Sequence, residues 1–139
     1  MSTKTKTKKK NKPVKETKFK DEFLKIVLTA ATSAEEKKGE NILILDVSKL
    51  TVISDYFLIV TAKSAAQIQA IANNIEENLK KTGYNLISKE GLPESSWIIQ
   101  DFGNLIVHIM QEKERSYYKL EKFWSNATIV NNELWQKAS

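Results

Sequence analysis

The sequence predicts an α/β fold in which a five-stranded mixed sheet is flanked by helices. Three observations indicate this fold class. Apolar residues recur at helical spacing in two long segments, residues 19–38 and 64–83. Runs of strand length that are rich in Ile, Leu and Val lie between and after these segments. Two further β-rich runs, residues 97–101 and 105–110, flank a glycine-containing turn and predict a β-hairpin.

The first predicted helix starts near Phe19 and is ended by Gly39. A near-continuous apolar run over residues 41–46 follows, and its Ile content predicts a buried strand. Residues 50–53 then cross over to a second buried strand, residues 55–61. The apolar positions of the helix share one packing face: Phe19, Phe23, Ile26, Val27, Ala30 and Ala34.

Ser64 and Gln67 have the spacing of a capping box and predict the start of the second helix, which Gly83 ends. Residues 84–89 alternate loosely and predict an edge strand, and residues 90–96 lead into the hairpin. The second helix presents one apolar stripe: Ile68, Ile71, Ala72, Ile75 and Leu79.

The two-residue loop of the hairpin is either residues 102–103 or residues 103–104, because Gly103 can supply the positive φ in both. Both hairpin strands are apolar on both sides, so we expect them in the middle of a sheet covered on both faces. Alternation assigns the sides: Trp97, Ile99 and Asp101 lie opposite Ile98 and Gln100, and Leu105, Val107 and Ile109 lie opposite Ile106, His108 and Met110.

The C-terminal part begins with a polar turn over residues 111–114. Residues 115–124 predict a short helical segment that is crowded with aromatic side chains. A final helix, containing Ile129, Leu134 and Trp135, completes the predicted layering.

Charge divides the chain into a basic tail and a mildly acidic domain. Residues 1–20 contain nine Lys and one Glu, whereas the other 119 residues hold 13 Lys and Arg against 16 Asp and Glu, a charge of −3. We expect residues 1–18 to form a disordered tail and residues 19–139 to form one domain. The tail is either a solvated extension or an arm that contacts RNA phosphates through Lys8, Lys9, Lys10 and Lys12.

Several functional classes are disfavoured by composition. The chain has no Cys and one His, so neither a thiolate site nor a zinc site is expected, and no cofactor is implied. No apolar run approaches the roughly 18 to 20 residues that span a bilayer, and no signal peptide is visible, so we expect a soluble protein of the cytoplasm or an organelle.

Candidate catalytic residues have no accompanying motif. Asp46, Asp55, Glu90 and Asp101 lie at strand ends, but no carboxylate pair and no glycine-rich phosphate loop occurs. His108 lacks a nucleophile elbow and is expected to be partly buried with a hydrogen-bond partner such as a strand-end carboxylate. The sequence therefore argues against an enzyme. Trp97, Tyr117, Tyr118, Trp124 and Arg115 are instead the residue types that dominate protein interfaces.

Seven motifs in series resemble the ribosomal silencing factor, or Iojap-related, family over about Phe23 to Trp124. They are Leu45-Asp-Val-Ser, Ser54-Asp-Tyr-Phe-Leu-Ile-Val-Thr, Ser64-x-x-Gln, Glu90-Gly, Trp97-Ile-Ile-x-Asp101, Gly103-Asn-Leu-Ile-Val-His108-Ile and Arg115-x-x-Tyr118-x-Leu-Glu-x-x-Trp124. The chain departs from the family pattern at Ala62, where Gly is usual, and at Ala66, where a basic residue often stands.

The resemblance implies a translation repressor without enzymatic activity. Such a factor binds the large ribosomal subunit through the large-subunit protein numbered fourteen and sterically blocks association with the small subunit. The family fold resembles a nucleotidyltransferase that lacks the catalytic acids. Apolar surface would also permit a homodimer of the free protein.

The matched motifs suggest site residues. Trp97 and Asp101 would belong to the partner-facing surface. Five further matched positions divide between core and contact in a way that the sequence leaves open: His108, Arg115, Tyr118, Glu121 and Trp124. Two rival functions are a nucleotidyltransferase-like, nucleotide-binding enzyme and an RNA-binding protein that works through the tail.

Overall fold

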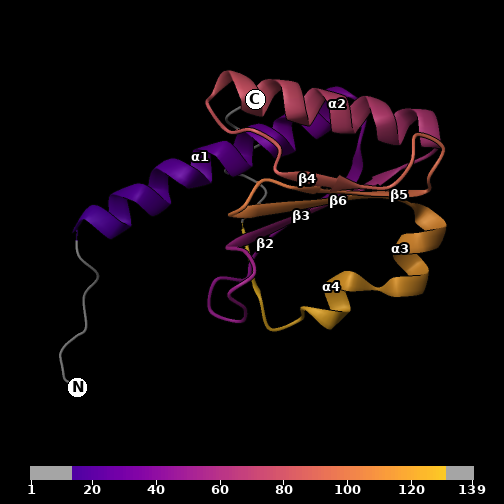
Figure 1. Ribbon diagram of the computed structural model, residues 1–139. Coiled ribbons are helices and arrows are strands. Elements are labelled where there is room, and N and C mark those ends of the chain that lie inside the picture. Colours follow the sequence, from indigo (N-terminus) through magenta and orange to yellow (C-terminus); the bar gives the residue numbers. More distant parts are fainter. Residues whose placement is uncertain (1–13, 131–139) are drawn as a thin grey trace.

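The computed structural model describes residues 14–130, with side chains from Glu22 onward, and shows a six-stranded mixed sheet with helices on both faces (Figure 1). The strand order is β4-β5-β6-β3-β2-β7. β3 and β6 are parallel at the centre, and all other neighbours are antiparallel. The strands are β2 (Glu40–Asp46), β3 (Tyr56–Ala62), β4 (Ser88–Glu90), β5 (Trp97–Asp101), β6 (Leu105–Gln111) and β7 (Thr128–Ile129).

The prediction of an α/β fold with a mixed sheet is confirmed, but the predicted count of five strands is wrong. The sixth strand is β7, which pairs with β2 in a region where a final helix was expected. Because β2 would otherwise be an edge strand, the returning chain satisfies part of its free edge. Leu134 and Trp135, which that helix was expected to contain, lie outside the described residues.

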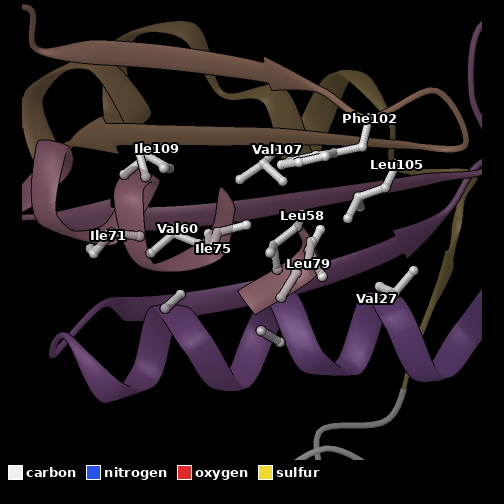
Figure 2. Packing of buried hydrophobic residues seen from close by; sticks show 14 of the residues in the cluster. Val27, Leu58, Val60, Ile71, Ile75, Leu79, Phe102, Leu105, Val107 and Ile109 are labelled. Atoms are coloured by element: carbon white, nitrogen blue, oxygen red, sulfur yellow. The ribbon is translucent and has the colours of Figure 1, made fainter. Parts of the chain in front are cut away.

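Helices α1 (Val14–Glu36) and α2 (Ala65–Lys81) pack side by side on one face of the sheet (Figure 1). The predicted stripe of α2 is fully buried. Val27 of α1 and Leu79 of α2 meet side chains of the central strands, such as Leu58 and Val107, in the larger hydrophobic core (Figure 2). Burying this area of apolar surface is the main stabilising contribution to the fold.

The first helix begins earlier than the sequence indicated. α1 starts at Val14, so residues 14–18, which were expected to be disordered, are helical. Residues 1–13, which include Lys8, Lys9, Lys10 and Lys12, lie outside the described part of the chain.

Gln67 connects the end of α1 to the start of α2. Its Nε2 donates to the carbonyl oxygens of Lys37 and Lys38, both at 3.0 Å, which satisfies acceptors left free at a helix end. Its backbone N–H donates to Ser64 Oγ at 3.1 Å, as the capping box predicted. The return bond differs, because Gln67 Oε1 accepts from the backbone N–H of Lys63 instead of Ser64.

The hairpin has the predicted alternation. Gln100 is completely buried on the helix-covered side, where its Nε2 donates to the Ala72 carbonyl at 2.9 Å. The backbone N–H of Phe102 donates to the Leu105 carbonyl at 2.9 Å, and Gly103 has φ of 93°. The loop is therefore residues 103–104, which decides between the two alternatives.

Three boundaries differ from the predictions. The edge strand is restricted to β4, because residues preceding it turn toward the core, where Tyr84 and Leu86 pack. The expected polar turn over 111–114 is instead the end of β6 and the start of α3 (Glu112–Tyr118). The aromatic segment is two helices, α3 and α4 (Leu120–Phe123), separated by Lys119 in the left-handed conformation with φ of 49°.

Candidate docking surface

The sheet face opposite α1 and α2 is only partly covered, contrary to the expectation of two covered faces. α3 and α4 lie on this side (Figure 1), and a smaller core forms beneath them around Phe57, Ile59 and Met110. Toward β5, Ile99 and Ile106 remain half-buried. Apolar side chains that stay partly accessible beside exposed aromatic rings are typical of an interaction site.

Seven aromatic rings form a continuous series across this side of the sheet. From α3, Tyr117 contacts Tyr118 at 5.0 Å between ring centroids, and Tyr118 contacts Trp97 at 4.8 Å. The series continues through His108, at 5.9 Å from Trp97 and 5.7 Å from Phe57.

The far end of the series lies on and after α4. Trp124 contacts Phe57 at 5.0 Å and Phe123 at 5.5 Å. All of these spacings fall in the range of favourable aromatic pairs. We call the accessible members of this series, all of these rings except the buried Phe57, together with Ile99, Ile106 and Asp101, the docking surface.

The docking surface is most exposed at its two ends. Tyr117 and Phe123 are 79% and 78% exposed, and Tyr118 is 52% exposed. Trp97 and Trp124 are half-buried, so each contributes to the smaller core and leaves part of its ring accessible. Among the matched aromatic residues, Tyr118 is therefore exposed, whereas Trp97 and Trp124 belong partly to the core and partly to the surface.

His108 lies in the middle of the series and is neutral. Its Nδ1 accepts the indole N–H of Trp97 at 3.2 Å, so its partner is an aromatic side chain and not the carboxylate that was expected. Burial lowers the pKa of His108 from its ordinary value of 6.5 to about 4, because the charged form loses hydration. His108 therefore contributes no positive charge to the surface at neutral pH.

Asp101 stabilises the hairpin turn at the end of β5. Its Oδ1 accepts the backbone N–H of Gly103 at 2.8 Å. The side chain is half-buried and lies on the same side of β5 as Trp97 and Ile99. Asp101 can therefore stabilise the turn and present negative charge at the edge of the docking surface.

Arg115 does not belong to the accessible surface, which corrects its inclusion among contact residues. Its side chain is only 9% exposed, and its Nε donates to Glu121 Oε2 at 2.8 Å. Its Nη1 donates to Thr61 Oγ1 at 2.8 Å and to the Asn41 carbonyl oxygen. Burial opposes ionisation of the Glu121 carboxyl, but the hydrogen bond and charge of Arg115 outweigh it and lower its pKa.

Sequence reasoning missed Phe57 and Phe123 as members of the aromatic series, the first as a buried ring and the second as an exposed one. Phe57 lies within a completely buried strand, and its neighbours were assigned only to the core. Its place in the series depends on the parallel pairing of Phe57 with Ile106, between strands far apart in sequence. Phe123 stands next to the matched Trp124, and aromatic clustering in that segment was the available signal.

The described residues contain no group of three or more His, Cys, Asp or Glu side chains that could hold a metal ion. Among the strand-end acids, Asp46 accepts from the backbone N–H and the hydroxyl of Ser48 at 3.0 and 2.6 Å, so it stabilises a turn. Within residues 14–130, no helix is long and apolar enough to cross a membrane. The described residues thus form an α/β structure whose most distinctive feature is the aromatic series on one side of its sheet.

Comparison with known proteins agrees with this class. The family described as ribosomal silencing factor during starvation matches residues 20–139. The ribosomal silencing factor RsfS of Bacillus subtilis is 38% identical over 106 residues, which cover 76% of this chain and 90% of that protein. The chloroplastic protein Iojap of Zea mays is 36% identical over 109 residues, covering 78% of this chain and 47% of that protein.

Solved structures show the same relationship. A crystal structure of a protein from Chromobacterium violaceum matches with a TM-score of 0.70 at 35% identity, covering 73% of this chain and 85% of that one. A second, from Bacillus halodurans, matches with a TM-score of 0.67 at 31% identity, covering 80% of this chain and 98% of that one. The chain belongs to the ribosomal silencing factor family.

Proposed function

We propose that this protein silences ribosomes by docking on the large ribosomal subunit, through its ribosomal protein number fourteen, and so blocks association with the small subunit. Family membership supports the silencing role. The observation that carries the docking is the uncovered sheet face with its continuous series of aromatic rings. The protein acts as a translation repressor in the cytoplasm or an organelle, in keeping with its bacterial and chloroplastic relatives.

The docking surface has the properties that a specific protein contact needs. A standard interface buries about 800 Å² on each partner, which one sheet face and a flanking helix pair can provide. Trp and Tyr residues carry much of the binding energy in such contacts, and Trp97 and Tyr118 pack together where the surface is accessible. Apolar Ile99 and Ile106 lie between these rings and the hairpin turn.

Charge complementarity supports a basic partner. The chain beyond residue 20 carries a net charge of −3, and Asp101 lies at the edge of the docking surface. A basic ribosomal protein would be steered toward such a surface, and wrong partners of like charge would be rejected.

The proposed mechanism is steric and requires no bond-making. While the factor occupies the contact face of the large subunit, the small subunit can join only by displacing it. The free energy of binding of the factor is therefore the additional free energy that subunit joining must overcome.

The proposal also includes a role for the basic tail and a homodimer of the protein when it is not bound to ribosomes. The basic arm that precedes α1, with Lys8, Lys9, Lys10 and Lys12, contacts nearby ribosomal RNA and gains affinity through counterion release. The same uncovered face that receives the ribosomal protein allows the free protein to form a homodimer. Removal of the arm is then expected to weaken binding to the subunit and to flatten its dependence on salt.

Co-sedimentation with purified large subunits tests the proposal, together with the formation of intact ribosomes from separated subunits. Trp97→Ala is expected to lose most of the binding and the inhibition of joining, because it removes the central ring of the accessible part of the surface. Asn73→Ala, an exposed position on α2, is the control and should bind normally. Unhindered joining with the wild-type protein would refute silencing by exclusion, and tight nucleotide binding by calorimetry would favour the enzyme alternative.

A further inference from the structure

We propose that Arg115 and Glu121 are positioning residues for the docking surface, and that they act by locking the short helices α3 and α4 onto the sheet. This inference rests on the proposed function, because it explains how the surface for the ribosomal partner is kept in a binding-competent arrangement. It assigns both residues to support of the surface, a division between core and contact that the sequence left open.

The two helices cannot hold their own arrangement. α3 has seven residues and α4 has four, and helices of this length are not stable in isolation. They are joined by Lys119 alone, whose left-handed backbone is unfavourable for a residue other than glycine. Contacts with the rest of the fold must therefore fix the direction of both helices.

The guanidinium of Arg115 links its own helix, α3, to three other elements. From α3 it reaches Glu121 on α4 through Nε, at 2.8 Å. Its Nη1 reaches the Thr61 hydroxyl on β3, at 2.8 Å, and the Asn41 carbonyl on β2. Its side chain is only 9% exposed, so these charge-assisted bonds are shielded from water.

Arg115 and Glu121 each lie three positions before a ring of the docking surface, Tyr118 and Trp124. Tyr118 follows Arg115 by three positions in the same helix, and such positions lie on neighbouring faces. The rotation of α3 that the Arg115 bonds impose therefore sets the position of the Tyr118 ring against Trp97, at 4.8 Å. On the other side, Trp124 follows Glu121 by three positions and packs on Phe57 at 5.0 Å.

A direct role in the contact is not compatible with this geometry. Nε and Nη1 of Arg115 are engaged inside the protein, and little of the side chain reaches the surface. A lysine at this position would keep the charge, but one ammonium cannot reproduce the planar fork that reaches acceptors on three elements. Arg115→Lys is therefore a conservative change that should release the helices.

A double-mutant cycle tests the proposal on the full-length protein. The affinity for purified large subunits is measured for wild type, Arg115→Lys, Tyr118→Ala and the double variant. Arg115→Lys is expected to weaken binding by about tenfold in the wild-type background and by clearly less when Tyr118 is already absent, because one of the two rings that Arg115 helps to position is then missing. Additive effects would show that Arg115 contributes independently of Tyr118 and would overturn the proposal.

A second measurement separates positioning from loss of folding. The near-ultraviolet circular dichroism signal of the aromatic residues should decrease in Arg115→Lys and in Glu121→Gln, while the far-ultraviolet signal stays unchanged. Glu121→Gln keeps the shape of the side chain and serves if Arg115→Lys does not fold. Lys113→Gln, an exposed change on α3, is the control and should alter neither signal nor affinity.

These readouts distinguish the possible failures. If the wild-type protein does not bind large subunits, the proposed function fails, whereas the aromatic signal still decides whether Arg115 orders the surface. If Trp97→Ala loses binding but Arg115→Lys and Glu121→Gln retain both binding and signal, the positioning role is wrong and the proposed function stands.

Discussion

The indole N–H of Trp97 donates to Nδ1 of His108 across neighbouring strands, at 3.2 Å. This bond requires Nδ1 to be unprotonated, so the neutral imidazole carries its proton on Nε2. The pair lies at the middle of the docking surface and joins the rings supplied by α3 to those supplied by β3. The stability of the surface is therefore linked to the protonation state of one histidine.

Acidification should destabilise the protein through His108. In the folded state its pKa is lowered to about 4 from an ordinary value of 6.5, so its contribution is fully present above pH 6.5 and is lost as pH falls toward 4. The expected loss is at most roughly 3 kcal/mol, because each pKa unit corresponds to about 1.4 kcal/mol. Urea unfolding at pH 7 and pH 4.5 measures it. His108→Gln removes the titrating group, and an equal pH dependence in that variant would contradict the assignment to His108.

Trp97→Phe should raise the pKa of His108 toward its ordinary value. The change keeps an aromatic ring but removes the N–H that stabilises the neutral imidazole. Titration of the imidazole resonances by NMR measures this shift directly, since the chain has a single His. The variant should also lose about 0.5–1.5 kcal/mol of stability, the usual net value of one hydrogen bond. A pKa that remains near 4 would mean that the Trp97 bond has little influence on the titration.

Gln100→Leu should be close to neutral or stabilising. Gln100 is completely buried, and among the described residues its Oε1 has no hydrogen-bond partner, which is unfavourable. A leucine of similar size removes this unsatisfied oxygen. It also removes one hydrogen bond, the one that Gln100 Nε2 donates to the Ala72 carbonyl oxygen. Gln100→Ala is the contrasting variant and should lose about 2 kcal/mol or more, because it leaves a cavity. Thermal unfolding of both variants decides; a Leu variant as unstable as the Ala variant would show that the amide bond dominates.

Asp101→Asn should separate the two roles of Asp101. The amide oxygen of Asn can still accept the Gly103 N–H, so the hairpin turn and the stability should be retained. The lost charge should weaken binding to large subunits by a few-fold and reduce its sensitivity to salt, as for an edge charge that steers association. Asp101→Ala should lose stability as well. Unchanged binding of the Asn variant across salt concentrations would remove Asp101 from the docking surface.

The parts of the fold that follow a local period were predictable. The stripe from Ile68 to Leu79 and the alternation along residues 97–101 repeat within one element, and the structure confirms both. The capping residues Ser64 and Gln67 are equally local. The break at Lys119 was not predictable, because it depends on what α3 and α4 pack against and not on a helix-breaking residue.

The candidate surface was only half predictable for a related reason. Trp97, Tyr118 and Trp124 were selected by residue type and motif, and they do lie in one series of rings. Arginine is a residue type that is common at interfaces, but Arg115 is buried by its contacts with Asn41 and Thr61, which are 74 and 54 positions away in the sequence. Contacts at such separations depend on strand order, which no local pattern specifies.

The single residue between α3 and α4 also limits how this protein can vary. One amino acid inserted beside Lys119 would change the direction in which α4 leaves α3 and would move Trp124 away from Phe57. The middle of the segment between β2 and β3 carries no comparable constraint, because Val52 and Ile53 are exposed there. An insertion or deletion at Lys119 is therefore expected to disturb the docking surface far more than an exchange of its exposed side chain.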